Sequence, residues 1–425
     1  MTAKRIGMLG VIMMFWFAIA FISNILGAII PDIIDNFHLK DLTLAGFIPT
    51  SFFVAYAVMS IPSGILVDKY GEKAILLIGF ILSFIGTLSF SLYPIYPILL
   101  VSSFIIGIGM AMLQTVLNPL QRAVGGEENY AFVAEVAQFI FGVASALGPL
   151  VYIYLVHALL PAIYVPGNNF IIDGFAKLTP VALPWVALYW LFTIILFIMI
   201  LLVIFIRFPK LETAMNKDTD TTSSYKVLMK QKYVWLFFLG IFCYVCTEQG
   251  ISIYMSKFLE QYHGFDHTTL GAVCVSLFWG LMMGGCIFGM VLLKLVDSRK
   301  LLFLSGIVSI ALFGVALFSP AGISRWAFPF MGFTISLMYS IIFSLALNSV
   351  SQYHGAFAGI LCSALVGGAI GPLLISKIAD LTSLRVGMML IFFTLVYITV
   401  IGLWANPLVN NKTVSLKQLA FRKKN

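Results

Sequence analysis

Runs of about 20 almost uniformly apolar residues recur along the whole chain, and they limit what it can fold into. A helix of that length crosses the hydrocarbon core of a bilayer, which is about 30 Å thick. The runs are continuously apolar and do not alternate in polarity, so they indicate helices and not barrel strands. Only 10% of the residues are charged, which is too few to cover a water-facing surface. The sequence therefore predicts an all-α polytopic membrane protein.

The runs predict twelve transmembrane helices in two groups of six, separated by a polar stretch. Six are expected at 6–30, 46–67, 74–93, 95–119, 131–155 and 184–206, and six at 233–256, 269–293, 301–319, 326–349, 355–376 and 386–405. Most of the loops are short, so consecutive helices are expected to pack as antiparallel neighbours. The predicted organisation is an N-terminal six-helix bundle (1–206), a cytoplasmic linker (207–232), a C-terminal six-helix bundle (233–406) and a cytoplasmic tail (407–425).

Positive charge is distributed unevenly along this topology. Most of the 25 Lys and Arg residues fall in the tails and loops that share one side of the predicted membrane arrangement. This bias follows the positive-inside rule and predicts that both termini are cytoplasmic. The net charge of +8 is therefore interpreted as a topology signal, with acidic lipid headgroups as contacts and without a nucleic-acid partner.

A short motif follows the second apolar run in the stretch GILVDKYGEK. Gly64, Asp68, Lys69, Gly71 and Lys73 resemble the loop signature of the major facilitator superfamily, whose final basic position is an alanine here. Asp68 is expected at a helix end, where it can meet a neighbouring helix N-terminus or a basic side chain. These five residues are interpreted as a conformational latch that breaks during transport. The alternative is a solvated charged turn.

Longer stretches are similar to the fucose/glucose/galactose–proton symporter family of that superfamily. They are SFFVAYAVMSIPSGILVDKYG, LQTVLNP, EVAQF, FPKLE, MYSIIFSLAL and VGGAIGPLLISKIAD. The resemblance implies the major facilitator fold, with two pseudo-symmetric six-helix bundles, and a sugar importer that works by alternating access. It also implies an integral protein of a bacterial cytoplasmic (inner) membrane, which we expect to be a monomer.

The chain departs from that family at several polar positions. The first span of the family carries a proton-titrating aspartate where this chain has Gly27, and the fucose branch has a carboxylate at the position of Gln114. Phe141 stands where the family commonly has Asn, and Cys286 stands where it has Arg. The ion coupling of the family therefore needs a different acid in this chain.

Two carboxylates are expected well inside the predicted spans, Glu135 and Glu248. A charge at mid-membrane costs about 2.5–3.5 kcal/mol on insertion scales, so such a group usually faces a cavity or a partner. Both are interpreted as ion-coupling residues for a proton or sodium ion, with Glu248 first because it aligns with an acidic position of the glucose-type branch. The alternatives are structural hydrogen bonding to a neighbouring helix and, for Glu135, a helix-end cap or part of a cytoplasmic gate.

Neutral polar and aromatic residues are expected to supply the substrate contacts. Gln114 and Asn118 are four residues apart and share one helix face, and Gln249 adjoins Glu248. A sugar needs several donors and acceptors, together with an aromatic plane on which to stack. The predicted substrate-binding residues are Gln114, Asn118, Gln138, Gln249, Asn348, Asn24, Trp16, Tyr56, Tyr254 and Trp279.

Other chemistries find little support in the chain. The five cysteines all lie within predicted spans and are interpreted as packing groups. The five histidines fall in predicted loops or at span ends and are interpreted as surface residues without metal-ligand spacing. No phosphate-binding loop, nucleophile elbow or zinc-protease helix is present, so we expect no enzyme, no cofactor and no metal.

The sequence thus predicts a secondary active transporter that imports a sugar or similar small polar solute together with a proton or sodium ion. An exporter or uniporter on the same fold is one alternative. A non-transporting membrane sensor is the other.

Overall fold

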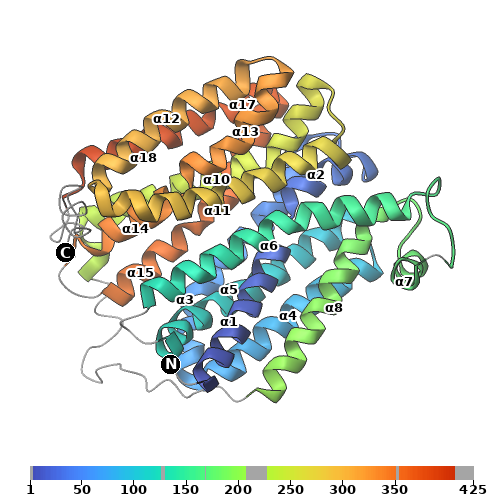
Figure 1. Ribbon diagram of the computed structural model, residues 1–425, viewed down its shortest axis with the longest axis horizontal. Coiled ribbons are helices and arrows are strands. Elements are labelled where there is room, and N and C mark those ends of the chain that lie inside the picture. The colour runs from blue at the N-terminus through green and yellow to red at the C-terminus, as the bar shows by residue number, and fades with distance from the viewer. Residues whose placement is uncertain (1–2, 126–129, 168, 207–226, 351–353, 407–425) are drawn as a thin grey trace, which may run out of the picture.

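The computed structural model describes residues 3–125, 130–167, 169–206, 227–350 and 354–406. Figure 1 shows helices throughout these residues, gathered into an N-terminal and a C-terminal bundle that lie side by side. Twelve segments are long and apolar enough to cross a membrane, which confirms the predicted number of spans. The fold is all-α, and the described residues contain no strand.

The N-terminal bundle holds the first half of the helices. They are α1 (Ala3–Ser23), α2 (Leu26–Asn36), α3 (Leu42–Tyr70), α4 (Glu72–Leu92), α5 (Tyr96–Gly125), α6 (Tyr130–Leu159), α7 (Phe170–Leu178), η2 (Pro184–Val186) and α8 (Ala187–Phe205). Within it, α4 packs against α5 and α8, α3 against α5, and α1 against α6.

The C-terminal bundle holds the second half. Its helices are α10 (Lys232–His263), η3 (His267–Gly271), α11 (Ala272–Leu295), α12 (Ser298–Phe318), α13 (Ala321–Ile335), α14 (Met338–Leu347), α15 (His354–Ser363), η4 (Ala364–Val366), α16 (Gly367–Leu381), α17 (Leu384–Met388) and α18 (Leu390–Trp404). Here α12 packs against α13 and α18, α11 against α13, and α10 against α16 and α18.

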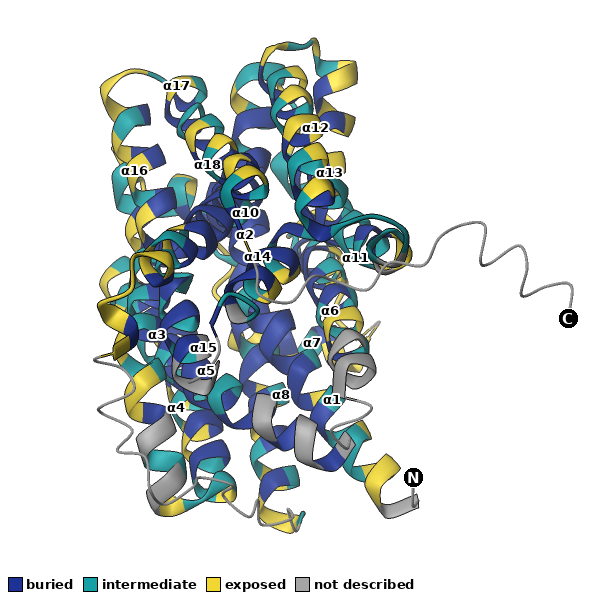
Figure 2. Ribbon diagram, turned by 90° about the vertical axis from the view of Figure 1, so that its left-hand side faces the viewer, coloured by how far each residue is buried: buried dark blue, intermediate teal, exposed yellow. Residues whose placement is uncertain are grey.

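The helices run between two ends of the molecule, called the near end and the far end. The near end carries the N-terminus, the end of α3 at Tyr70 and the start of α10 at Lys232. The far end carries the end of α2, the start of α3 at Leu42 and the end of α16 at Leu381. Figure 2 shows exposed positions along the outer helices of both bundles. Exposed large apolar residues include Phe197 and Phe393, as a lipid-facing surface requires.

Two spans reach further toward the far end than the sequence indicated. The first runs to Asn36 and the seventh to His263, so Asp32 and Glu260 fall inside membrane-spanning segments. Both acids lie close to the ends of these longer spans, whereas Glu135 and Glu248 were expected well inside theirs. The apolar pattern locates the middle of a span well. It does not fix the ends, because a polar residue there fits a helix end and a loop equally well.

Several spans are interrupted near their middle. The first breaks between α1 and α2 at Asn24 and Ile25, and Pro31 lies inside α2. Proline has no N–H to donate to the carbonyl four residues earlier, which weakens the helix in the turn before it. The tenth span is likewise divided into α13 and α14, and the eleventh into α15, η4 and α16. Broken helices expose backbone groups at mid-membrane, where transporters place their sites.

One helix was not predicted. The polar segment between the fifth and sixth spans contains α7, which packs on α6 and α8 at the far end. The side chain of Asn169 starts it by accepting hydrogen bonds from the N–H groups of Ile171 (3.0 Å) and Ile172 (3.4 Å). Its burial of Ile172 and Phe175 fixes it to the bundle, a signal too short to stand out in the sequence.

Hydrogen bonds join the two bundles in the far half of their interface. Asp380 of α16 accepts from the backbone N–H groups of Leu42 and Thr43 at the start of α3, both at 2.7 Å. Thr50 of α3 donates to the carbonyl of Ala369 at 3.0 Å, further along the same pair of helices. On the other flank, Ser276 of α11 donates to a carbonyl of α6 at 2.6 Å. The bundles are therefore closed against each other at the far end.

Gly27 marks the tightest crossing in this closed half. A Cβ atom added at Gly27 of α2 would clash with the backbone carbonyl of Ser252 in α10. Because a backbone carbonyl at a helix crossing has little freedom to move, only glycine fits this position while the far end is closed. The residue that replaces the usual aspartate of the related family is thus part of the closed interface.

We expect Gly27→Ala to be destabilising because overpacking of a tight contact costs about 1–3 kcal/mol. The matched control is Gly280→Ala on α11, where an added Cβ meets nothing within 4 Å. At Gly280 the exchange is expected to be neutral or stabilising by up to about 1 kcal/mol, since alanine favours the helix. Thermal unfolding of both variants in detergent checks this, and equal shifts would contradict the packing argument.

Candidate functional site

Two of the predicted latch residues, Gly71 and Lys73, lie where α3 is joined to α4. Gly71 has a φ of 81°, a conformation that favours glycine, and it turns the chain from α3 into α4. The Lys73 ammonium donates to the carbonyls of Ile204 (2.8 Å) and Ile206 (3.0 Å), at the end of α8. Lys73 thereby caps a helix C-terminus within its own bundle, where a cation is favoured.

Glu248 lies near the middle of α10 and is half-buried. The hydroxyl of Tyr244, one turn earlier on the same helix, donates to its Oε1 at 3.1 Å. The side-chain amide of Gln249 donates to its Oε2 at 3.5 Å. Among the salt bridges of the described residues, none involves Glu248. A mid-membrane carboxylate held by neutral donors is suited to bind and release a cation.

The position of Glu248 along α10 is related to the Gly27 crossing. Ser252 meets Gly27 across the bundle interface, and Glu248 is four residues before Ser252 on the same face of α10. Glu248 therefore lies one turn nearer to the near end than this crossing. This places it at the level where α1 breaks before α2, next to the interface.

The N-terminal bundle presents a matching set of polar groups around that break. Gln114 of α5 donates to the hydroxyl of Tyr56 in α3 at 3.0 Å. The amide of Asn24, at the break itself, donates to the hydroxyl of Ser145 in α6 at 2.8 Å. The structure thus brings three of the predicted substrate residues, Gln114, Tyr56 and Asn24, onto helices that surround the centre of this bundle.

Two predicted substrate residues make contacts inside their own bundle. The indole N–H of Trp16 donates to Oε1 of Gln121 at 3.0 Å, linking α1 to α5. Tyr254 is fully buried in α10, and its hydroxyl donates to the carbonyl of Pro372 in α16 at 3.1 Å. Both groups have found partners in the protein and stabilise helix packing in this state.

Trp279 differs from them. Its side chain is 2% exposed, and its indole nitrogen has no hydrogen-bond partner among the described residues. It lies on the same face of α11 as Ser276 and Met283, which contact α6 of the other bundle. A buried donor without an acceptor is costly. The indole N–H of Trp279 is therefore available to a polar group that enters the bundle interface.

The remaining predicted residues are less informative. Gln138 of α6 is exposed, and Asn348 is half-buried at the end of α14. The side chains of Gly64, Asp68, Lys69, Asn118 and Glu135 lie outside the described part of the chain. Their predicted roles stay predictions.

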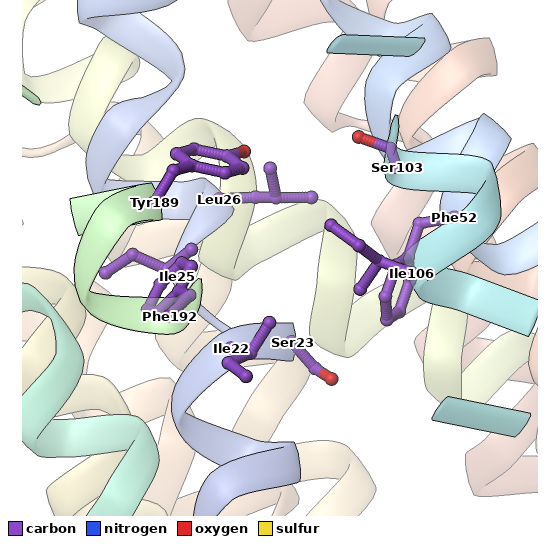
Figure 3. Close-up of a pocket in the computed structure, with 9 residues that line it drawn as sticks. All are labelled: Ile22, Ser23, Ile25, Leu26, Phe52, Ser103, Ile106, Tyr189 and Phe192. Atoms are coloured by element: carbon purple, nitrogen blue, oxygen red, sulfur yellow. The ribbon is translucent and has the colours of Figure 1, made fainter. Parts of the chain in front are cut away.

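A small cavity of about 20 Å³ lies beside the break in the first span (Figure 3). It belongs to the N-terminal bundle alone and is mostly apolar, with hydroxyl groups from Ser23, Ser103 and Tyr189. A sugar needs more hydrogen-bond partners than these, so the cavity is not the substrate site that the polar residues mark. Its lining is Ile22, Ser23, Ile25, Leu26, Phe52, Ser103, Ile106, Tyr189 and Phe192.

Three residues of the central region were missed by sequence reasoning. Tyr244 is the closest donor to Glu248, Ser145 fixes Asn24, and Ser23 flanks the break beside the cavity. Tyr244 lies four residues before an intramembrane acid, and helical spacing alone would have drawn attention to it. The serines carry no such signal, because serine is common in membrane helices and bonds its own backbone.

Comparison with known proteins identifies the fold family. The family model described as the Major Facilitator Superfamily matches residues 11–372. The chain belongs to the Major Facilitator Superfamily. It is 27% identical over 396 residues to a glucose/galactose transporter of Brucella abortus, a match that covers 91% of each chain. It is 22% identical to the L-fucose-proton symporter of Escherichia coli, over 86% of this chain and 85% of that one.

The solved structures agree with this assignment. The crystal structure of the E. coli fucose:proton symporter matches 95% of this chain and 99% of that one, with a TM-score of 0.69 and 20% identity. The predicted all-α superfamily fold is thereby confirmed. The relatives are transporters and not enzymes.

The Asn24–Ser145 hydrogen bond is expected to fix the break between α1 and α2 to α6. Removing Ser145 takes away the acceptor of the buried Asn24 amide, whereas without Asn24 the Ser145 hydroxyl still donates to the carbonyl of Phe141 at 2.8 Å. Removing both should cost less than the sum of the two single changes. A double-mutant cycle of Asn24→Ala and Ser145→Ala, measured by unfolding in detergent, should give a coupling of about 0.5–1.5 kcal/mol. Strictly additive effects would show that the bond contributes nothing.

Proposed function

We propose that this chain is a secondary active transporter that imports a sugar by alternating access, coupled to a proton or a sodium ion. Similarity to a glucose/galactose transporter and to an L-fucose-proton symporter over most of the chain supports this substrate class. The protein works as a monomer in a bacterial cytoplasmic (inner) membrane, with both termini in the cytoplasm. Its partners are the sugar, the co-transported cation and the lipid bilayer, without nucleic acid.

The orientation follows from the charges at the near end. Lys73, Lys230, Lys232, Arg299 and Lys300 lie at the ends of helices there, and the positive-inside rule makes this end cytoplasmic. The far end then faces the outside. Because the bundles are hydrogen-bonded together at the far end, the structure represents a state that is closed to the outside.

The observation that carries the proposal is Glu248. It is a half-buried acid near the middle of α10, one turn from the Gly27 crossing, and it accepts hydrogen bonds from the neutral side chains of Tyr244 and Gln249. Such a group binds a proton or sodium ion when solution reaches it and releases the ion on the other side. Glu248 is therefore the first coupling residue of the proposal, and Glu135 is the second.

Substrate contacts are proposed on both bundles around this acid. Gln249 and Trp279 offer donors from the C-terminal bundle, and Tyr56 with Gln114 offers a hydroxyl and an amide from the N-terminal bundle. A sugar bound between them bridges the two bundles and favours the closed states of the cycle. The five latch residues at the α3–α4 loop are proposed to control the cytoplasmic side.

A uniporter is the second candidate, and Gly27 is the observation that favours it. An aspartate at this position is incompatible with the closed far end, because even a Cβ atom meets the Ser252 carbonyl. The chain has therefore lost the coupling acid of the related family at a place where it cannot be restored without moving a helix. If Glu248 does not replace it, uptake is downhill only.

Transport in proteoliposomes tests the proposal. With radiolabelled glucose, galactose and fucose, we expect accumulation above the outside concentration when a proton or sodium gradient is directed inward. Equilibration without accumulation under either gradient would favour the uniporter. Binding without uptake of any of the sugars would favour a sensor and contradict the proposal.

Glu248→Gln is expected to abolish gradient-driven accumulation while sparing exchange of labelled for unlabelled sugar. The amide keeps the shape and hydrogen-bonding capacity of the side chain but cannot exchange a proton. Accumulation and counterflow measured on the same proteoliposomes separate the two effects.

Asp41→Asn is the matched control, since Asp41 is exposed at the far end and its side chain makes no cap hydrogen bond to α3. It should leave both activities unchanged. Undiminished accumulation by Glu248→Gln would remove Glu248 from the coupling mechanism.

A further inference from the structure

A cluster of charged groups connects the bundles at the far end, well away from Glu248. Asp32 and Asp35 come from α2, Lys257 and Glu260 from α10, and His267 from the first residue of η3. These five residues are called the far-end cluster here. The side chains of Asp32, His267, Lys257 and Glu260 are 14%, 16%, 17% and 26% exposed, so most of the cluster is shielded from solvent.

His267 is the bridge within this cluster. Its Nδ1 lies 2.7 Å from Oε1 of Glu260, and its Nε2 lies 3.4 Å from Oδ1 of Asp32 in the other bundle. Both ring nitrogens thus face carboxylate oxygens. A neutral imidazole has one donor nitrogen only, and its other nitrogen would present a lone pair to an anion. The geometry fits an imidazolium that donates on both sides, which means that the closed state holds a proton here.

The groups around His267 carry more negative than positive charge, which favours the protonated imidazole. The second oxygen of Asp32 accepts from the hydroxyl of Tyr152 in α6 at 2.5 Å. Lys257 contacts Oε2 of Glu260 at 2.7 Å and Oδ1 of Asp35 at 3.7 Å. Lys257 is the one permanent cation against three carboxylates in this cluster, so its net charge is −2 with a neutral His267 and −1 once His267 gains a proton.

Asp266 is the fourth acid in reach, and it fixes the position of His267. It lies outside the membrane-spanning segments and caps η3, accepting from the N–H of Thr268 at 2.7 Å and from its hydroxyl at 2.6 Å. Burial raises the pKa of Asp266, but these hydrogen bonds outweigh it and leave the pKa below its usual value. Asp266 therefore stays ionised beside His267 and adds to the negative surroundings.

We propose that the far-end cluster is a proton-binding lock between the bundles. When His267 takes up a proton from the outer solution, the cluster holds the two bundles together at the far end, and this closure is called the outer gate. Opening separates Asp32 from His267 and admits water, so the proton is held less tightly in the open state. Proton binding and closure are therefore linked, and each favours the other. The site is distinct from Glu248, and its placement on the outside rests on the orientation given under the proposed function.

The sign of the effect follows from this linkage. Low outer pH fills the site and favours the closed gate, whereas high outer pH empties it and favours opening. A tenfold difference in proton affinity between the two states changes the closed-to-open ratio by up to about tenfold across the titration. The Asp380 contact with the start of α3 supplies closure that involves no imidazole, so its removal should weaken closure equally at each pH near neutrality.

A divalent metal is the competing occupant. One ligand atom each from Asp35, Glu260 and His267 lie within 4.8 Å of one another, a spacing that suits a metal ion. The Lys257 ammonium already contacts Glu260 and Asp35, however, and occupies the place where a second cation would be needed. The proton is therefore the better fit, and the experiment distinguishes the two.

The test measures the distance between the bundles in the full-length protein without substrate. Spin labels at Tyr93→Cys and Leu381→Cys report on the far end, since both positions are exposed there on opposite bundles. The background has its native cysteines replaced by alanine and is first shown to retain the pH response. In lipid nanodiscs, we expect the short-distance population to fall as the pH is raised from about 5 to about 9, the range that brackets an ordinary imidazole.

Two variants of His267 should respond in opposite directions. His267→Gln removes the titrating group, so the gate is expected to open more at low pH and to lose its pH dependence. His267→Arg keeps a permanent cation that donates to both carboxylates, so the gate should stay closed at every pH. His38→Asn is the histidine control, exposed at the same end and outside the cluster, and it should behave as the parent protein.

Three outcomes would overturn the proposal. One is an unchanged pH dependence in His267→Gln, and another is an equal loss of pH dependence in His38→Asn. The third is opening of the parent gate by EDTA at low pH, which would assign the cluster to a metal. Because no sugar is present, the result stands whether or not the protein transports sugar, and failed uptake alone leaves it untouched.

Discussion

The absence of water in the bilayer core is the constraint on which the structure depends. Each backbone N–H and C=O there must find its partner within the protein, so the chain is helical through every described span. Where a helix is interrupted, as at Asn24, side chains and neighbouring helices have to supply the missing partners. At this break the Asn24 amide donates to Ser145 of α6, and Gln114 and Tyr56 form a second polar pair within the same bundle.

The same constraint explains what could be predicted from the sequence. Twelve spans and two bundles follow from apolar runs, because nothing else in a protein produces uninterrupted hydrophobicity of that length. Glu248 and Gln114 were identifiable for the converse reason, since an isolated polar residue within such a run needs a cavity or a partner. Individual partners were out of reach, because Tyr244 and Ser145 are unremarkable in composition and acquire their roles only through helix packing.

The far-end cluster shows where prediction from one span at a time fails. Asp32, Glu260 and His267 each lie near a span end, where a charged residue is ordinarily solvated and attracts no attention. They come together because α2, α10 and η3 meet at the bundle interface, which depends on pairings far apart in the sequence. The histidines were interpreted as surface groups, and for His267 that interpretation was wrong.

The hydrogen bonds between Asp380 and the start of α3 make the backbone amides there sensitive to separation of the bundles. The first amide groups of a helix have no partner inside the helix, and here the carboxylate that accepts from Leu42 and Thr43 belongs to the opposite bundle. When the bundles separate at this end, those two amides lose their acceptor and the first turn of α3 is released to solvent. Amide hydrogen exchange at the start of α3 therefore measures how often the gate opens, and the measurement needs neither a label nor a bound substrate.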